Sequence, residues 1–148
     1  MTPGGPNTTD PGPAFEILEH TADVGIVAHG RDLPSLFANA ARGMFALMVD
    51  LEGVEEREER QVEVEGRDLE VLMVRWLSDL LYYLDAEEMV FRRFEVTGVN
   101  GNRLSAKAFG ERIDRERHLL HFGVKAVTRH MLEVVQENGY RATILFDI

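Results

Sequence analysis

Two acidic groups at the end of the sequence have the chemistry and the spacing to bind a metal ion. The chain ends in Leu145-Phe146-Asp147-Ile148, so the side-chain carboxylate of Asp147 and the α-carboxylate of Ile148 lie one residue apart. Two such carboxylates repel each other unless a cation or a basic side chain lies between them. Hard divalent cations such as Ca²⁺ and Mg²⁺ prefer oxygen ligands, and one further carboxylate would complete a reasonable site. The alternative is a frayed, solvated chain end.

The hairpin that leads to this end would place basic groups beside it. If Asn138-Gly139 forms a two-residue loop, the residues that flank the loop pair with each other, and Asp147 lies opposite His130. Ile148 then lies opposite Arg129. Cross-strand partners are about 5 Å apart, so an imidazole and a guanidinium group would flank the terminal carboxylates. A slip of one residue, or a bulge in either strand, would remove this arrangement.

Two further polar positions interrupt apolar stretches. His20-Thr21-Ala22-Asp23 separates two short apolar runs and could supply an imidazole and a carboxylate, although a turn in which Asp23 binds its own backbone explains the same pattern. Lys125 lies within Val124-Lys125-Ala126-Val127-Thr128 and is one of two lysines against fourteen arginines. An outward-facing position on the solvent side of a sheet is the alternative for Lys125.

The strong local signatures of nucleotide-binding and hydrolytic sites are missing from the sequence. It contains no GxxxxGK phosphate loop, no GxSxG nucleophile elbow, no HExxH motif and no GxGxxG motif. The chain has no cysteine, which excludes disulfides, thiolate metal ligands and a cysteine nucleophile. Asp114 and His118 are one helical turn apart and can form a hydrogen bond, but this spacing alone is a weak indication of a site.

Two helices and several short strands must position these residues. Asp32 and Asp68 are the expected N-caps of the helices, and each is followed by apolar residues at steps of three and four. Trp76, the only tryptophan, is expected in the core, and Asn100-Gly101 favours a tight hairpin turn. Strands are expected at 15–19, 24–29, 61–65, 90–99, 103–109, 122–135 and 140–147. This order predicts an α+β fold, a two-layer sandwich in which two helices cover one face of a mostly antiparallel sheet.

Length and composition indicate one domain. Residues 1–14 hold four of the five prolines among 148 residues, so we expect a disordered tail before a single domain over 15–148. The sequence has no apolar run of about 18 residues and no secretory signal, and we expect a cytoplasmic protein that does not contact a membrane. The formal net charge of −10 disfavours nonspecific nucleic-acid binding. That charge is polarised, with ten acids and three arginines in 50–70 but nine basic and four acidic residues in 92–130.

Five stretches of the sequence resemble the archease family. They are His20-Thr21-Ala22-Asp23-Val24-Gly25, Trp76-Leu77-Ser78-Asp79-Leu80-Leu81-Tyr82, Gly110-Glu111 through Asp114 and His118, Val124-Lys125-Ala126-Val127-Thr128, and the terminal Phe146-Asp147-Ile148. The resemblance extends from Phe15 to the end of the chain. One departure is visible, because Arg129 stands where an aromatic residue is usual.

The resemblance implies a non-catalytic partner of the RtcB-type RNA ligase, which acts in tRNA splicing and RNA repair. Archeases promote guanylylation of the active-site histidine of that ligase and its multiple turnover, and they are associated with its use of a broader range of nucleoside triphosphates. Association with tRNA, other RNA and GTP would then be indirect, through the ligase. The resemblance therefore implies an accessory role and no reaction of the chain's own.

The resemblance also implies a set of site residues. The metal site, carried over by position, would use Asp23, Asp147 and the carboxylate of Ile148, with Ca²⁺ favoured in the family and Mg²⁺ or Mn²⁺ as alternatives. Lys125 matches a family position that is important for activation. The remaining candidates for the activation or partner site are His20, Asp114, His118 and His130.

Two functions of other classes remain open from the residues alone. A small metal-dependent phosphoester hydrolase could use Asp23, Asp147 and His130 as ligands or base, and it would turn over substrate without a partner. A chaperone-like interaction module would depend on apolar surface, and in that case Asp23 would be replaceable.

Overall fold

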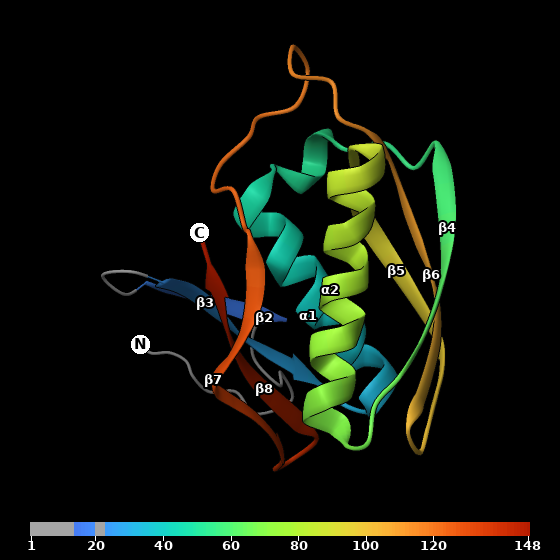
Figure 1. Cartoon of the computed structure of the whole chain (residues 1–148), viewed down its shortest axis with the longest axis vertical. Coiled ribbons are helices and arrows are strands. Elements are labelled where there is room, and N and C mark those ends of the chain that lie inside the picture. Colours follow the sequence, from blue (N-terminus) through green and yellow to red (C-terminus); the bar gives the residue numbers. More distant parts are fainter. Residues whose placement is uncertain (1–13, 20–22) are drawn as a thin grey trace.

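The computed structural model describes residues 14–19 and 23–148 (Figure 1). The tail expected over 1–14 therefore lies outside the described residues except for Ala14, and His20 lies outside them as well. The described residues form seven strands, two long helices and one short 3₁₀ helix, η1 (Leu51–Gly53). The predicted α+β class is confirmed. No helix in these two ranges is long and apolar enough to cross a membrane.

The strands are divided between two sheets, in which all neighbouring strands are antiparallel. The larger sheet has the order β2-β3-β8-β7 and the smaller sheet the order β4-β6-β5. The strand bounds are Phe15–Glu19 for β2, Asp23–Gly30 for β3, Glu58–Glu65 for β4, Met89–Asn100 for β5, Arg103–Arg112 for β6, Ala126–Gln136 for β7 and Tyr140–Asp147 for β8. Because β8 is an inner strand, the end of the chain is held between two neighbours.

The helices begin where the sequence predicts. The Asp32 carboxylate accepts the backbone N–H of Ser35 at 2.9 Å, and the Ser35 hydroxyl lies 3.2 Å from the Asp32 backbone N–H, which completes a capping box before α1 (Leu33–Met48). The Asp68 carboxylate caps α2 (Leu69–Glu87) by accepting the backbone N–H of Val71 at 2.8 Å. Each helix packs against both sheets: α1 against β3 and β5, and α2 against β7 and β4 (Figure 1).

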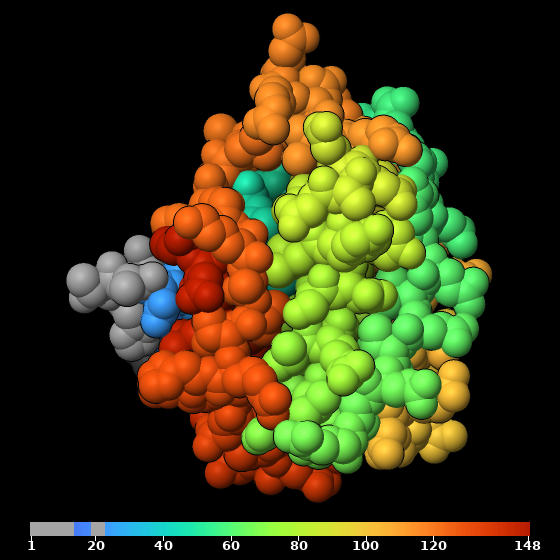
Figure 2. Space-filling view, in the orientation of Figure 1, coloured from blue at the N-terminus to red at the C-terminus, as the bar shows by residue number. Residues whose placement is uncertain are grey.

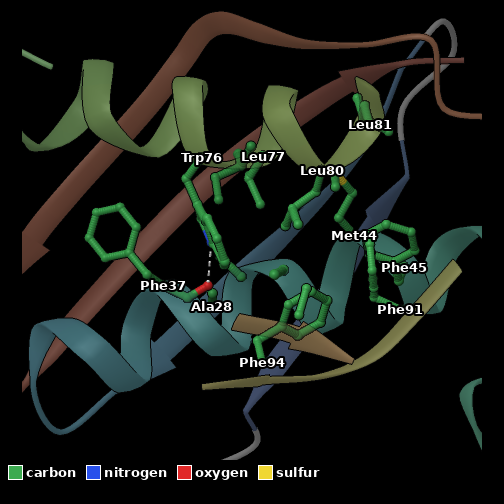
Figure 3. Packing of buried hydrophobic residues seen from close by; sticks show 14 of the residues in the cluster. Ala28, Phe37, Met44, Phe45, Trp76, Leu77, Leu80, Leu81, Phe91 and Phe94 are labelled. Carbon is green, nitrogen blue, oxygen red and sulfur yellow. Dashed lines mark hydrogen bonds between the residues drawn. The ribbon is translucent and has the colours of Figure 1, made fainter. Parts of the chain in front are cut away.

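Aromatic side chains form the centre of the core between the helices and the smaller sheet (Figure 3). The buried indole Nε1 of Trp76 donates to the backbone carbonyl of Phe37 at 2.8 Å, which ties α2 to α1. Phe45 meets Phe91 edge to face at 5.6 Å between ring centroids, and Trp76 meets Phe94 at 6.0 Å. Such pairs stabilise a core beyond the apolar area that they bury. The expectation that Trp76 lies in the core is confirmed.

Two local predictions are displaced along the chain. The hairpin between β5 and β6 turns at Gly101-Asn102, one residue later than expected from Asn100-Gly101. The strand expected from residue 122 begins at Ala126. The reason is that the backbone N–H of Phe122 donates to the carbonyl of Leu47 at the end of α1, so this part of the chain runs beside the helix and not in a strand ladder.

The pairing of β7 with β8 differs more strongly from the prediction. Gln136 pairs with Tyr140, so the hairpin loop has three residues and not two. Farther along, residues 129–132 form a bulge opposite Ile144 alone. Met131 in this bulge has a φ of 60°, in the left-handed region. The extra residues move the pairing register between the loop and the chain end by three positions.

The bulge changes the neighbours of the chain end. Asp147 pairs with Ala126, so the predicted placement of His130 opposite Asp147 and of Arg129 opposite Ile148 is wrong. His130 instead lies within the bulge, four residues from Ala126, the partner of Asp147. Its backbone N–H donates to the hydroxyl of Thr128. Pairing can be counted outward from a hairpin loop only while neither strand has an extra residue. The bulge in β7 adds such residues, so the count fails here.

Candidate functional site

Asp23 and Asp147, here called the acid pair, lie opposite each other at one end of the larger sheet. Asp23 is the first residue of β3 and Asp147 the last residue of β8, and the two are register partners. Directly opposed residues of antiparallel strands project from the same face, with Cβ atoms about 5 Å apart. Asp23 is half-buried and Asp147 is exposed. The fold thus brings together two of the three predicted metal ligands, although 124 positions separate them in the chain.

The start of β7 lies on the other side of Asp147. Ala126 is its register partner there, and the backbone N–H of Lys125 donates to the backbone carbonyl of Asp147 at 2.7 Å. The Lys125 side chain is exposed. Figure 2 shows the red atoms of the chain end at the surface, beside orange atoms of the segment that includes β7. The backbone of Lys125 is therefore fixed at the chain end, while its side chain extends into solvent.

The chemistry of the acid pair suits a hard divalent cation. Both side chains offer only oxygen as a ligand. Among the described residues, the ion pairs involve acids other than Asp23 and Asp147. Within the described ranges no group of three His, Asp or Glu side chains is arranged so that it could hold a metal ion. A further oxygen would have to come from the backbone or from the carboxylate of Ile148, whose residue is 40% exposed. Ca²⁺ and Mg²⁺ accept both carboxylate and carbonyl oxygens, so this donor set fits them.

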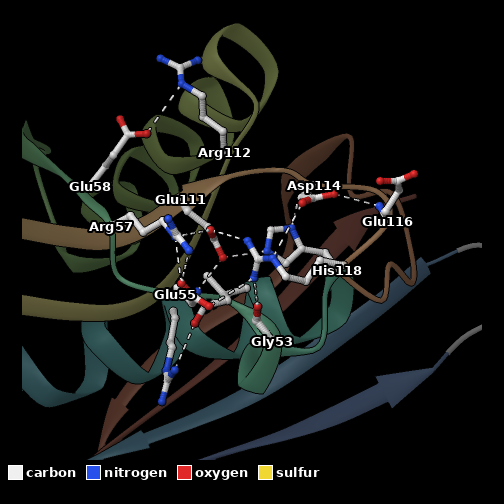
Figure 4. A network of polar contacts seen from close by, with 12 residues as sticks. Gly53, Glu55, Arg57, Glu58, Glu111, Arg112, Asp114, Glu116 and His118 are labelled. Atoms are coloured by element: carbon white, nitrogen blue, oxygen red, sulfur yellow. Dashed lines mark hydrogen bonds and ion pairs between the residues drawn. The ribbon is translucent and has the colours of Figure 1, made fainter.

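A second charged group, here called the Glu111 cluster, lies at the end of β6 (Figure 4). Glu111 is only 3% exposed. Its Oε1 accepts from the Arg117 guanidinium at 2.5 Å, and its Oε2 accepts the backbone N–H of Glu55 at 2.7 Å. Nε2 of His118 lies 2.9 Å from Oε2, and Nε of Arg57 lies 3.4 Å from Oε1. Each oxygen of the buried carboxylate therefore has at least two neighbours that donate or carry positive charge.

The hydrogen bonds of His118 fix its tautomer. The backbone N–H of Asp114 donates to Nδ1 of His118 at 2.9 Å, so Nδ1 must carry a lone pair. The ring proton then lies on Nε2, which donates to Glu111. The predicted contact between Asp114 and His118 exists, but it involves the backbone of Asp114 and not its carboxylate. The Asp114 carboxylate instead accepts the backbone N–H of Glu116 at 3.0 Å.

The surroundings of Glu111 favour its ionised form. Burial, the strongest single influence, raises the pKa of this carboxyl. The hydrogen bonds from Arg117, from the Glu55 backbone and from His118 together outweigh burial, and they lower the pKa of Glu111 from 4.5 to about 2. Glu111 is therefore a charged group held inside the protein, and its contacts tie β6 to the segment before β4 and to the loop after β6.

The predicted site residues are therefore divided among three places. Asp23, Asp147 and Lys125 meet at the end of the larger sheet. Asp114 and His118 belong to the Glu111 cluster, His130 belongs to the bulge, and His20 lies outside the described residues. No local pattern of the sequence gave Glu111 a role of its own, and the only indication was its place in the stretch that resembles the archease family.

The archease family model matches residues 15–148, under the description Archease protein family. The chain is 43% identical over 136 residues to Protein archease of Sulfurisphaera tokodaii, covering 90% of this chain and 98% of that protein. It is 41% identical to Protein archease of Pyrococcus abyssi, again over 90% of this chain and 98% of that one.

A solved structure shares the fold. The solution structure of Methanobacterium thermoautotrophicum protein 1598 matches with a TM-score of 0.80 and 40% sequence identity. The match covers 91% of this chain and 99% of that one. Family model, sequence relatives and structure thus agree over nearly the whole described chain. The chain belongs to the archease family.

Proposed function

We propose that this protein activates an RtcB-type RNA ligase in tRNA splicing and RNA repair. In this proposal it promotes guanylylation of the active-site histidine of the ligase, supports multiple turnover, and broadens the range of nucleoside triphosphates that the ligase uses. Membership of the archease family supports this role. The observation that carries it is the meeting of Asp23, Asp147 and Lys125 at one exposed end of the sheet.

The proposed site would act by charge and position. The acid pair and the carboxylate of Ile148 would hold a divalent cation, with Ca²⁺ favoured and Mg²⁺ or Mn²⁺ as alternatives, and a bound cation supplies neutralisation of phosphate oxygens. The exposed ammonium group of Lys125 would bind a phosphate of the nucleotide from the adjacent strand. Because the backbone of Lys125 is hydrogen-bonded to Asp147, the two groups would keep a fixed relation while nucleotide is positioned.

One alternative loses its structural support. A metal-dependent hydrolase needs a base beside the acid pair, and the residue considered for that task was His130. The bulge separates His130 from the positions that pair with Asp147. A non-catalytic role for this chain agrees better with the described geometry.

The test combines the protein with its ligase, GTP, Mn²⁺ and an RNA substrate, and measures guanylylated ligase over time. We expect Asp23→Asn, Asp147→Asn and Lys125→Ala to lose most of the stimulation. Glu59→Gln, an isosteric change at an exposed acid of β4, is the matched control and should stimulate like wild type. Full stimulation by the three site variants would overturn the proposed site.

A further inference from the structure

Next to the acid pair, β8 leaves no room for a side chain on β3. Gly25 lies two residues after Asp23, and Leu145 lies two residues before Asp147. The two are register partners, so they lie on the same face of the sheet as the two carboxylates. Leu145 is only 3% exposed. A Cβ added to Gly25 would lie 2.5 Å from Cδ2 of Leu145 and 2.6 Å from the backbone oxygen of Ile144. No other amino acid at position 25 fits without movement of β8.

The contact with the Ile144 oxygen is the more restrictive of the two. A leucine methyl group can move to another rotamer, whereas a backbone oxygen moves only if the strand moves. The left-handed region is not involved, because Gly25 does not have a positive φ. The requirement for glycine here is therefore one of space, beside the residues that would hold the cation.

We infer that Gly25 is a positioning residue for the acid pair, because the missing side chain lets Leu145 close over β3 and thereby sets the separation of Asp23 and Asp147. This inference rests on the proposed function, since it gives Gly25 a role toward the cation. A change in the separation of Asp23 and Asp147 can be detected by comparing the binding of two ions of different size. Mg²⁺ requires near-octahedral ligands at about 2.0–2.1 Å, whereas Ca²⁺ accepts more variable geometry at about 2.3–2.6 Å. A wider acid pair should therefore lose Mg²⁺ more than Ca²⁺.

The experiment is titration calorimetry of the isolated protein, ending at Ile148 without a tag, with MgCl₂ and CaCl₂ separately. We expect Gly25→Ala to weaken Mg²⁺ binding by about 10-fold, the lower end of the range for residues that support metal ligands, and Ca²⁺ binding less. Gly98→Ala is the matched control, because a Cβ at this strand position meets no atom within 4 Å. Its affinities for both ions should equal those of wild type.

The outcomes separate this inference from the proposed function. If Asp147→Asn binds both ions as well as wild type does, the metal site itself is wrong. If Asp147→Asn loses the ions but folded Gly25→Ala keeps wild-type affinities, or loses both ions equally, the positioning role is wrong and the metal site stands. Should Gly25→Ala fail to fold, Leu145→Ala decides: a preferential loss of Mg²⁺ supports the role, and unchanged affinities overturn it.

Discussion

The Glu111 cluster and the acid pair show two ways in which this fold treats carboxylates. Glu111 is buried, and Arg117, His118 and the Glu55 backbone occupy its oxygens. Asp23 and Asp147 face each other at the surface, where two like charges raise each other's energy. The first arrangement is complete within the protein, whereas the second would gain stability from the cation that we propose. The difference separates an acid that stabilises the fold from acids that are available to a ligand.

The largest expected effect comes from removing the buried acid. Glu111→Ala removes the acceptor of the buried His118 imidazole and the nearest acid of the Arg117 guanidinium, and we expect the free energy of unfolding to fall by about 3 kcal/mol. Urea unfolding followed by circular dichroism measures this change. A loss below about 0.5 kcal/mol, the size of an ordinary surface substitution, would contradict the structural role of Glu111.

The acid pair should respond in the opposite way. Without added cation, Asp147→Asn removes a repulsion, and its stability should equal or exceed that of wild type. With Ca²⁺ at about 100 times its Kd, wild type should gain about 2.7 kcal/mol and the variant almost nothing. Thermal unfolding with and without CaCl₂ measures the difference. An equal gain in Tm for both proteins would show that the cation binds elsewhere.

The depressed pKa of Glu111 predicts a dependence of stability on pH. The pKa is about 2 in the folded protein and 4.5 as an ordinary glutamate, so the stabilisation is complete above pH 5 and is lost as the pH falls toward 2. Between pH 7 and pH 3 this group alone should account for about 2 kcal/mol of lost stability. Urea unfolding of wild type and Glu111→Gln across this range measures it, and parallel profiles would contradict the assignment.

The smallest effect should come from the outer member of the Glu111 cluster. The Arg57 side chain is 65% exposed and lies 3.4 Å from Glu111, so solvent screens their interaction. We expect Arg57→Ala to cost at most about 1 kcal/mol, clearly less than Glu111→Ala. Denaturant unfolding of both variants under the same conditions provides the ranking. The reverse order would mean that Arg57 stabilises the fold through contacts other than the one with Glu111.

The sequence predicted the elements of the fold better than their pairing. Helix starts at Asp32 and Asp68 followed from local capping and apolar spacing, and both are confirmed. The register of β7 and β8 depended on a three-residue loop and on the left-handed Met131, which no local pattern specifies. The burial of Glu111 was equally hidden, because its contact with Glu55 spans 56 positions in the chain.

Only part of the candidate site could be predicted from the sequence. The oxygen chemistry of the chain end could be inferred from Asp147 and Ile148, and the family resemblance supplied Asp23. The direct opposition of Asp23 and Asp147 became visible only with the pairing of β3 and β8. Side-chain chemistry can be inferred from local sequence, whereas the meeting of two distant strands depends on the packing of the whole sheet.

The most direct test of the central claim counts ligation events per ligase molecule with excess RNA, GTP and Mn²⁺. Wild-type protein and Asp147→Asn are compared at equal concentrations, with Glu59→Gln as the control. We predict many turnovers with wild type and with Glu59→Gln, and about one turnover with Asp147→Asn. Many turnovers with Asp147→Asn would contradict a role of the acid pair in activating the ligase.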